Sequence, residues 1–377
     1  MKWQTKKLED ICNVEYGARV VRRRDGGSKY PVYGGGGETF AMDEYNREDR
    51  MIVARFAMSE QCTRFVKGKF FLNDSGLTLS PKDKQIILQD FLDFQILALN
   101  DRIYSLARGA AQKNLDVPSF RKMEISYPES TEEQKRIVKL LDEIFEKTAK
   151  AQENTEKNLQ NSKELFESYL NKIFENPSED SQTKMLSEFF EITSSKRVFK
   201  SEWKSSGVPF YRAREIVKLA QQGFVNNSLF VSEEMYSRYA TKYGIPKEGD
   251  LMVTGVGTLG ICYLVKKKDK FYFKDGNIIW LKTKNNINSQ FVEYAFKSKL
   301  LRKQISNTIG ATVGTYTIIR AKNTSLLVPP LLKQQEIVKK LGTLSAETKK
   351  LEKIYEQKLT DLEEFKKSVL KKAFSGK

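Results

Sequence analysis

Histidine is absent from this 377-residue sequence, and cysteine is scarce, with three residues. Without an imidazole the chain cannot form a serine–histidine–aspartate triad, an HExxH zinc site, or any site that uses histidine as acid or base. Cys12, Cys62 and Cys262 are widely separated, which favours neither a disulfide framework nor a metal site built from paired cysteines. We expect them to be small buried apolar side chains.

Long hydrophobic runs are also missing. The sequence contains no apolar stretch of about eighteen residues, the length that a membrane-spanning helix needs. Its start, "MKWQTKKLEDICNVEYG", has neither the apolar core nor the cleavage pattern of a signal peptide. The sequence therefore predicts a cytoplasmic protein with no membrane partner.

Positive charge is abundant. The 65 lysines and arginines exceed the 48 acidic residues and give a formal charge of +17 and a pI near 9.4. Such an excess indicates a polyanionic partner, with nucleic acid ahead of a membrane surface. An acidic protein partner is the alternative explanation of the charge.

Two segments of the chain begin and end alike. "QKRIVKLLDEI" starts at Gln134 and "QQEIVKKLGTL" starts at Gln334, an interval of 200 residues. The match resumes at the same interval, where "SYLNKIF" (168–174) corresponds to "SVLKKAF" (368–374). The sequence therefore contains two copies of a segment of equal length.

Each copy has the spacing of a coiled-coil helix. Apolar or small residues alternate at intervals of four and three, from 137 to 155 and from 337 to 355. Ser130 and Glu133 match a capping box, and about 45 residues of helix would span roughly 65 to 70 Å. An amphipathic helix on a globular core would explain one such segment, but not two of equal length. The residues predicted to lie at the helix–helix interface are Ile137, Leu141, Ile144, Ile337, Leu341 and Leu344.

The repeat extends upstream of both helices. In each copy a Gly-Ala pair is followed, nineteen residues after the glycine, by a proline that precedes the helix: Gly109 with Pro128, and Gly310 with Pro329. "LEDICNVEYGAR" resembles "LSEFFEITSSKR" at an offset of 178, so the second globular part is 22 residues longer. We expect four segments: globular domains at 1–128 and 179–330, and helices at 129–178 and 331–377. If the helices pair antiparallel, a pseudo-twofold axis relates the halves.

The charge follows this division. Segment 1–128 has 21 basic and 17 acidic residues, and 179–330 has 24 and 13. Segment 129–178 has 8 and 11, and 331–377 has 12 and 7. Because the largest excess lies in the second globular segment, the globular parts are the expected phosphate-binding surfaces.

Three short motifs suggest other chemistry and fail on inspection. "GVGTLG" (255–260) matches a dinucleotide-binding pattern, but strand-like "ICYLV" follows it instead of a helix. A hairpin turn, or a turn that approaches DNA, is the better reading. "YGGGGETF" (33–40) lacks the lysine of a phosphate loop and is either structural or DNA-facing. "VPPLL" (328–332) lacks the residues of a methyltransferase loop.

The two repeats and one stretch of the first globular segment together resemble the DNA-specificity subunit of type I restriction-modification enzymes. The resemblance rests on "GAAQKNL … ISYPESTEEQKRIVKLLDEI", on "GATVGTY … LLVPPLLKQQEIVKKL" and on "KYPVYGGGGETF", and covers both repeats. The second copy departs from the pattern at Val313 and at Gln335–Glu336, so we do not carry a glutamine contact over to that half.

The resemblance implies a mixed α/β fold: two target-recognition domains with curved mixed sheets, joined by two long antiparallel α-helices. It implies double-stranded DNA as a partner, together with two modification subunits that bind S-adenosylmethionine and methylate adenine. It also implies restriction subunits. The chain itself would need no cofactor or metal and supply no catalytic residue.

Candidate DNA contacts are basic, amide and hydroxyl residues in expected loops. Arginine suits guanine, asparagine and glutamine suit adenine, and lysine clusters suit phosphate. In the first globular segment the candidates are Arg22, Arg23, Arg24, Tyr33, Arg55, Arg64, Gln112 and Lys113. In the second they are Lys196, Arg197, Lys200, Tyr211, Arg212, Arg214, Thr258, Asn277 and Thr312.

The sequence thus predicts a non-catalytic subunit that reads a split, asymmetric DNA site and positions a methyltransferase. A stand-alone DNA-modifying enzyme is one alternative, but it would need a cofactor loop or clustered carboxylates. A basic coiled-coil scaffold is the other, and it would leave the two unequal globular segments unexplained.

Overall fold

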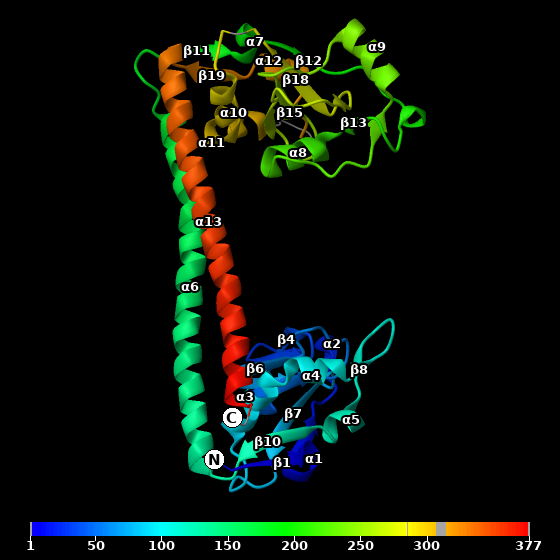
Figure 1. Ribbon diagram of the computed structural model, residues 1–377, viewed down its shortest axis with the longest axis vertical. Helices are drawn as coiled ribbons and strands as arrows, with labels where there is room; N and C mark the ends of the chain where they lie inside the picture. Colours follow the sequence, from blue (N-terminus) through cyan, green and yellow to red (C-terminus); the bar gives the residue numbers. More distant parts are fainter. Residues whose placement is uncertain (1, 285, 307–313, 376–377) are drawn as a thin grey trace. The chain divides into compact units, whose positions relative to one another are not determined.

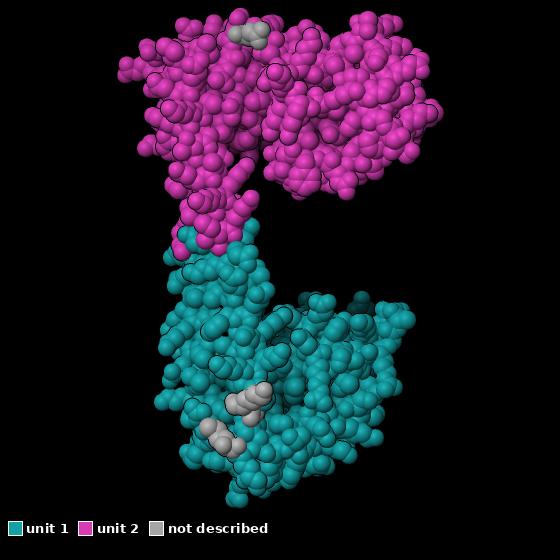
Figure 2. Space-filling model, in the orientation of Figure 1, with its two compact units in different colours: residues 1–157, 355–377 teal, residues 158–354 magenta. Residues whose placement is uncertain are grey.

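The computed structural model describes residues 2–284, 286–306 and 314–375. The chain divides into two compact units, which Figure 2 colours separately. Unit 1 comprises Met1–Lys157 and Tyr355–Lys377, and unit 2 comprises Asn158–Ile354. Each unit contains a head, which we define as residues 2–128 (head 1) and 179–330 (head 2), and a part of each long helix.

The two predicted long helices are present. Helix α6 (Thr131–Glu175) has 45 residues and α13 (Leu331–Ala373) has 43. Only half of the predicted capping box forms: the Ser130 hydroxyl accepts from the Glu133 amide at 3.4 Å, while the Glu133 carboxylate binds Arg136 instead. The fold class predicted from the sequence, a mixed α/β protein with two long helices, is confirmed.

The helices run antiparallel in unit 1. Ile137 and Leu141 of α6 share a hydrophobic core with Leu370 of α13. Farther along α6, the Gln152 side chain accepts a hydrogen bond from Lys366 at 2.9 Å. Because the α13 partner moves backward as the α6 residue moves forward, the directions are opposite.

The same arrangement occurs in unit 2, where Leu170 and Phe174 of α6 share a core with Leu341 of α13. The apolar seam is not continuous, however. Of two residues in the predicted four-and-three series, Leu351 is 39% exposed, whereas the small polar Thr348 is buried and bonds its hydroxyl to the backbone one turn earlier. The contact between helices thus relies on small side chains as well as apolar ones.

Head 1 is built on a six-stranded mixed sheet of order β2-β7-β5-β6-β3-β4, in which only β3 and β6 are parallel. A separate antiparallel pair, β1-β10, leads into α6. The elements (Figure 1) are β1 (Trp3–Lys7), α1 (Leu8–Ile11), β2 (Cys12–Tyr16), α2 (Arg22–Asp25), β3 (Tyr30–Gly34), β4 (Gly37–Met42), β5 (Arg47–Ala54), β6 (Thr63–Leu72), β7 (Gly76–Pro81), α3 (Gln89–Ala98), α4 (Asn100–Ser105), β8 (Ala107–Arg108), β9 (Asn114–Leu115), α5 (Val117–Arg121) and β10 (Glu124–Pro128).

Head 2 repeats this plan. Its sheet has the order β12-β18-β15-β16, a smaller sheet β14-β13-β17 contains the parallel pair, and β11-β19 leads into α13. The elements are β11 (Gln182–Met185), α7 (Leu186–Phe189), β12 (Phe190–Thr193), η1 (Lys200–Glu202), β13 (Val208–Tyr211), α8 (Ala213–Gln222), β14 (Phe230–Val231), α9 (Glu233–Tyr243), β15 (Leu251–Thr254), β16 (Cys262–Leu264), β17 (Tyr272–Phe273), β18 (Ile278–Thr283), α10 (Ser289–Lys297), α11 (Lys299–Ser306), α12 (Ile318–Lys322) and β19 (Ser325–Val328).

The extra length of head 2 lies between β12 and β15. Here head 2 has two helices, α8 and α9, whereas the corresponding part of head 1 has only the four-residue α2. The motif at 255–260 joins β15 to the antiparallel β16, as its hairpin reading predicts. Length was therefore added mainly in this place, and the single six-stranded sheet of head 1 corresponds to a four-stranded and a three-stranded sheet in head 2.

Candidate nucleic-acid interface

The two heads present equivalent strand ends. In head 1 the parallel strands β3 and β6 end together, and the Tyr33 carbonyl accepts from the Asn73 amide at 2.9 Å. In head 2 the parallel strands β13 and β17 end together, and the Tyr211 carbonyl accepts from the Lys274 amide at 2.8 Å. Tyr33 and Tyr211 therefore occupy the same position in the two heads.

The residue after the next strand also corresponds. The Arg55 amide, after β5, donates to the Ser75 carbonyl at 2.8 Å, and the Gly255 amide, after β15, donates to the Asn277 carbonyl at 2.9 Å. The Arg55 carbonyl accepts from the Leu115 amide at 2.9 Å, and the Gly255 carbonyl accepts from the Tyr316 amide at 3.0 Å. A Cβ at Gly255 would lie 2.7 Å from the Tyr316 carbonyl oxygen, so head 2 has no room for a side chain here.

The glycine-rich turn of head 1 packs against the turn between β6 and β7. The Gly35 amide donates to the Ser75 hydroxyl at 3.0 Å. A Cβ would lie 2.5 Å from that hydroxyl at Gly34 and 2.8 Å from the Ser75 carbonyl oxygen at Gly35. A Cβ at Gly36 would meet nothing within 4 Å. Packing thus leaves no room for a side chain at Gly34 or Gly35. At Gly36, the exposed glycine of this turn, packing would permit one.

Two predicted arginines lie beside this turn. The Arg55 guanidinium lies 4.9 Å from the Tyr16 ring centre and 4.5 Å from that of Phe56. The Arg64 guanidinium donates to the Gly35 carbonyl at 3.5 Å. The Arg55 guanidinium also donates to the Asp74 carbonyl at 3.3 Å, and neither arginine takes part in a salt bridge among the described residues. Both cations are therefore held in place with their charge uncompensated, which suits a phosphate or a guanine edge.

The three predicted arginines of α2 lie on the surface. Arg22 and Arg23 are exposed, and Arg24 pairs with Asp25 at 2.8 Å. The hydrogen bond from Arg24 lowers the pKa of the Asp25 carboxyl. Because α2 precedes β3, this cluster lies at the start of the β3-β4 hairpin, whereas the glycine-rich turn closes its other end.

The other candidates of head 1 are partly engaged within the head. The Tyr33 hydroxyl donates to Glu38 at 3.2 Å, and burial, together with that carboxylate, raises the pKa of Tyr33. Gln112 donates to the Asn114 side chain at 3.3 Å, and the Lys113 ammonium donates to a neighbouring tyrosine hydroxyl at 3.1 Å. Gln112 and Lys113 lie between β8 and β9. The hydrogen bond from the Leu115 amide of β9 to the Arg55 carbonyl joins this hairpin to the strand ends.

In head 2 the cluster after β12 lies next to the β17-β18 turn. Arg197 pairs with Asp275 of that turn at 3.3 Å. The Lys196 ammonium lies 5.2 Å from the Tyr243 ring centre. Lys200 is an exposed residue of η1. The structure thus brings Lys196 and Arg197, but not Lys200, into contact with neighbouring elements.

The cluster after β13 combines core and surface. Tyr211 is 9% exposed, and its ring stacks on Phe271 with centres 4.9 Å apart. Arg212 and Arg214 both bind the Glu215 carboxylate. Burial opposes ionisation of Glu215, yet the hydrogen bonds from the two arginines prevail and lower its pKa. Arg214 keeps 65% of its side chain exposed, against 25% for Arg212, so Arg214 is the more accessible.

The remaining candidates of head 2 are polar loop residues. Thr258 is exposed in the β15-β16 loop, and its carbonyl accepts a hydrogen bond from the Thr254 hydroxyl. Asn277 is half-buried in the β17-β18 turn, where its carbonyl is bonded to Gly255. Thr312 lies outside the described residues. Thr258 and Asn277 therefore lie at the same end of the sheet.

Family comparison now identifies this architecture. The model of the type I restriction modification DNA specificity domain matches residues 1–161 and again 178–361. The chain belongs to this family. A Haemophilus influenzae protein named as a type I restriction enzyme specificity subunit is 23% identical over 344 residues, which span 88% of this chain and 85% of the relative. The chain is thus a DNA-specificity component of a type I restriction-modification system.

Solved structures share the fold of this specificity subunit. A chain from a structure that concerns complex assembly and conformational transition of the type I R-M system matches with a TM-score of 0.74. It has 15% identity and covers 99% of this chain and 97% of its own. The HsdS subunit of Thermoanaerobacter tengcongensis matches with a TM-score of 0.58, 14% identity, and coverage of 99% and 96%. At these identities the likeness concerns the fold alone.

The described residues also bear on membrane spans, metal sites and the cysteines. Among residues 2–284, 286–306 and 314–375, none of the helices combines the length and apolar character that crossing a bilayer requires. Within the same ranges no three Cys, Asp or Glu side chains gather as potential metal ligands. Cys12, Cys62 and Cys262 are all buried as free thiols, as predicted.

One structural residue, Gln134, was not among the predicted site residues. The fully buried Gln134, at the start of α6, accepts from the Leu88 amide at 2.8 Å and donates to the carbonyls of Ile86 at 2.9 Å and Pro128 at 3.0 Å. One side chain therefore connects the end of the last strand, the segment before α3 and the start of the long helix. We call this connection the joint between head and helix.

The second unit contains the same joint. Gln334 is 2% exposed, accepts from the Asn288 amide at 2.9 Å and donates to the Pro329 carbonyl at 2.8 Å. The departure from the motif at Gln335–Glu336 leaves this contact intact. The signal was the repetition of one glutamine at an interval of 200 residues.

The predicted interface residues divide between core and edge. Leu141 is 1% and Leu341 0% exposed, and Ile137 is 8% exposed. The half-buried members of the set are Ile144, Ile337 and Leu344. Leu141 and Leu341 each belong to a core that combines residues of a head with residues of the other long helix, so each lies where both helices meet a head.

Proposed function

We propose that this specificity subunit reads a bipartite, asymmetric site in double-stranded DNA, with one half-site for each head. The observation that carries the proposal is the pair of equivalent strand ends, which share a backbone frame but present different side chains. Arg55 and Arg64 border the turn of head 1, and Arg197 and Arg214 border the corresponding turns of head 2. Because the two heads have different side chains at equivalent backbone positions, they should select different bases.

We further infer that the subunit positions other proteins for catalysis. Two modification subunits would dock on α6 and α13, bind S-adenosylmethionine and methylate adenine after extruding it from the duplex. Restriction subunits would join the same complex in the cytoplasm. The chain itself would supply recognition and no cofactor site. Purified chain incubated with DNA and labelled S-adenosylmethionine should transfer no label, and label on the DNA would make it a stand-alone enzyme.

Mapping of methylated bases across the host genome, with and without this gene, tests the recognition role. The expected result is one split motif with methylated adenines that disappears when the gene is removed. A methylation pattern that does not depend on the gene, or a continuous motif, would contradict the proposal.

The lengths of α6 and α13 suggest a spacing role. Both helices continue through the boundary between the units, so their length should set the gap between half-sites. Insertion of four residues, about one turn, into both helices should lengthen the accepted gap and leave both half-sites unchanged. An unchanged gap would show that another feature sets it.

A further inference from the structure

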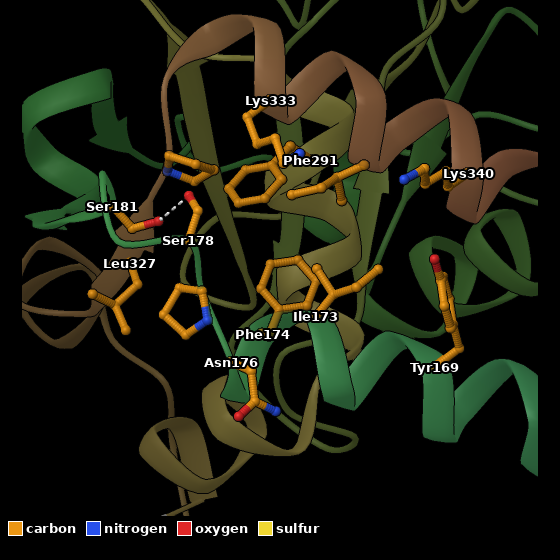
Figure 3. Close-up of a pocket in the computed structure, with 13 residues that line it drawn as sticks. Tyr169, Ile173, Phe174, Asn176, Ser178, Ser181, Phe291, Leu327, Lys333 and Lys340 are labelled. Atoms are coloured by element: carbon orange, nitrogen blue, oxygen red, sulfur yellow. Dashed lines mark hydrogen bonds between the residues drawn. The ribbon is translucent and has the colours of Figure 1, made fainter.

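A pocket of about 240 Å³ lies in unit 2, where the end of α6 meets the start of α13. Its floor is aromatic: the rings of Phe174 and Phe291 lie 5.3 Å apart. Ile337 and Pro329 extend the apolar lining, and Ser181 borders it from the segment before β11. Figure 3 shows the two phenylalanine rings facing the same space.

The internal repeat explains why the pocket is there. "QTK" occurs at 4–6 in β1 and at 182–184 in β11, and each of these strands pairs with the last strand of its head. The residues that precede these two triplets are Trp3 and Ser181. Ser181 is therefore the unit 2 counterpart of Trp3.

In unit 1 the corresponding space holds an indole. The Trp3 ring lies 6.4 Å from Phe91, which lies 5.2 Å from Phe374. At the 200-residue interval these phenylalanines correspond to Phe291 and Phe174, which have almost the same spacing. The pocket of unit 2 is thus the space left where a serine replaces a tryptophan on a conserved aromatic floor.

The rims of the two spaces differ in charge. Lys333 and Lys340 line the pocket of unit 2, and Lys333 pairs with the exposed Glu336 at 2.9 Å. In unit 1 the residues 200 positions earlier are Glu133 and Leu140. An occupant of the unit 2 pocket would therefore meet an aromatic floor beside two cations, and an aromatic group next to a carboxylate fits both.

The surface around the pocket indicates that the occupant belongs to a protein. Tyr169, at the rim, is 36% exposed, and Leu165, one turn earlier on the same face of α6, is 52% exposed. An apolar stripe that continues into an open aromatic pocket is typical of a surface that another protein covers.

We propose that this pocket receives an aromatic side chain, next to an acidic residue, from the modification subunit. The identity of that partner rests on the proposed function. The equivalent site in unit 1 is filled by Trp3, so this anchor exists on one side of the specificity subunit only. The two docking surfaces for modification subunits are therefore unequal.

Binding of N-acetyltryptophan to the full chain tests the pocket without any partner. The expected result, by isothermal titration or ligand-observed NMR, is one site that prefers N-acetyltryptophan to its uncharged amide. Ser181→Trp should fill the pocket and abolish binding, whereas Ser181→Thr should keep it. Trp3→Ser should open a second site that lacks the preference for the carboxylate. Equal binding by wild type and Ser181→Trp, or no binding by wild type, would overturn the assignment of an aromatic site.

Assembly with the purified modification subunit tests the occupant. Wild type and Ser181→Thr should assemble with the same affinity, and Ser181→Trp should lose at least tenfold at one of the two docking surfaces. Thermal unfolding would verify that Ser181→Trp is folded. Normal assembly of Ser181→Trp would refute the docking proposal and leave the proposed function standing. Failure of the wild type to assemble would refute the proposed partner, while N-acetyltryptophan would still decide whether the pocket accepts an indole.

Discussion

Head 1 and head 2 use one backbone frame and place their arginines at different points of it. After the shared tyrosine, head 1 continues with Gly34 and the glycine-rich turn, while head 2 continues with Arg212 and helix α8. After the next strand the order is reversed: head 1 has Arg55, and head 2 has Gly255. Where one head has an arginine the other has a buried glycine, so equivalent positions of the two heads carry different side chains.

The added length of head 2 follows the same logic. Helices α8 and α9 are inserted between β12 and β15, and head 2 has a four-stranded and a three-stranded sheet where head 1 has one six-stranded sheet. Head 2 also has the larger positive excess, with 24 basic and 13 acidic residues against 21 and 17 in head 1. The added region, residues 194–250, has 10 basic and 6 acidic residues, so most of the extra charge lies elsewhere in head 2. The joints to the helices stay alike.

The largest loss of stability is expected at Gln134 and Gln334, which join head and helix in the same way in both units. Gln134→Leu leaves three buried backbone groups of unit 1 without their partner and should lower the free energy of unfolding by about 3 kcal/mol. Gln334→Leu removes the partner of two such groups and should cost about 2 kcal/mol in unit 2. Urea unfolding measures both, with the exposed neighbour Gln335→Ala as a control that changes stability by less than about 0.5 kcal/mol. A large effect in one unit only would show that the joints are not equivalent.

A smaller change in stability is expected at a matched pair of carboxylates, Asp93 in unit 1 and Glu293 in unit 2, and it should depend on pH. Asp93 on α3 is buried, and burial raises its pKa to about 7 from the ordinary value of 3.8. Because the folded state binds this proton more tightly than the unfolded state, the stability it contributes is complete below about pH 4. That stability is lost as the pH rises through about 7. Asp93→Asn should therefore be more stable than wild type by about 2 kcal/mol at pH 8 and equal to it at pH 4.

The matched position in unit 2 should behave in the opposite way. Glu293, 200 residues later on α10, accepts from the Lys297 ammonium at 3.1 Å. Glu293→Gln should lower stability at pH 8, by less than about 1 kcal/mol, because it removes a partly exposed ion pair. Urea unfolding at both pH values measures the two variants. If Asp93→Asn destabilised the protein at pH 8, burial would not be the dominant influence on Asp93.

Arginine exchanges should separate the half-sites. Arg55→Ala should relax base selection in one half-site and Arg214→Ala in the other, each with about a tenfold loss of affinity for the preferred duplex. Selection from a library of randomised duplexes at fixed salt concentration measures both. Lys6→Ala on β1 is the matched control and should leave the selected motif unchanged. Relaxation of both half-sites by one exchange would break the assignment of one half-site to each head.

The smallest change in stability is expected at the tip of the glycine-rich turn. Gly36→Ala meets no neighbour and should change stability by less than about 0.5 kcal/mol, whereas Gly35→Ala places a Cβ 2.8 Å from the Ser75 carbonyl oxygen and should cost more. Thermal unfolding compares the two. A loss of DNA affinity in the stable Gly36→Ala variant would indicate close approach of this turn to DNA. Unchanged affinity would make the turn structural.

Much of the architecture followed from local sequence patterns. The four-and-three spacing predicted both long helices, because a helix face depends only on residues three and four positions apart. The glycine motif at 255–260 was assigned to a hairpin because a strand-like segment follows it. The seam was less regular than predicted at Leu351, since exposure depends on what the partner helix presents at that level.

The candidate site was harder to predict. Arg55 and Arg64 carry no nearby signal of their position. They come together because β5 pairs antiparallel with β6, which places Arg64 opposite Ile52, close to the end of β5 that Arg55 follows. Tyr211 was a candidate for DNA contact, yet its ring stacks on Phe271. A polar or aromatic residue in an expected loop does not reveal which way its side chain points.

The sequence by itself determined that the chain is a tandem repeat with two helices of nearly equal length and no histidine chemistry, because these properties depend on composition and on contacts within a few turns. Only the tertiary structure decided that Tyr33 and Tyr211 occupy the same position, that Gln134 and Gln334 join helix to head, and that Ser181 leaves open a space that Trp3 fills. These features depend on strand pairing between residues more than a hundred positions apart, and pairing over such distances is set by the packing of the whole unit.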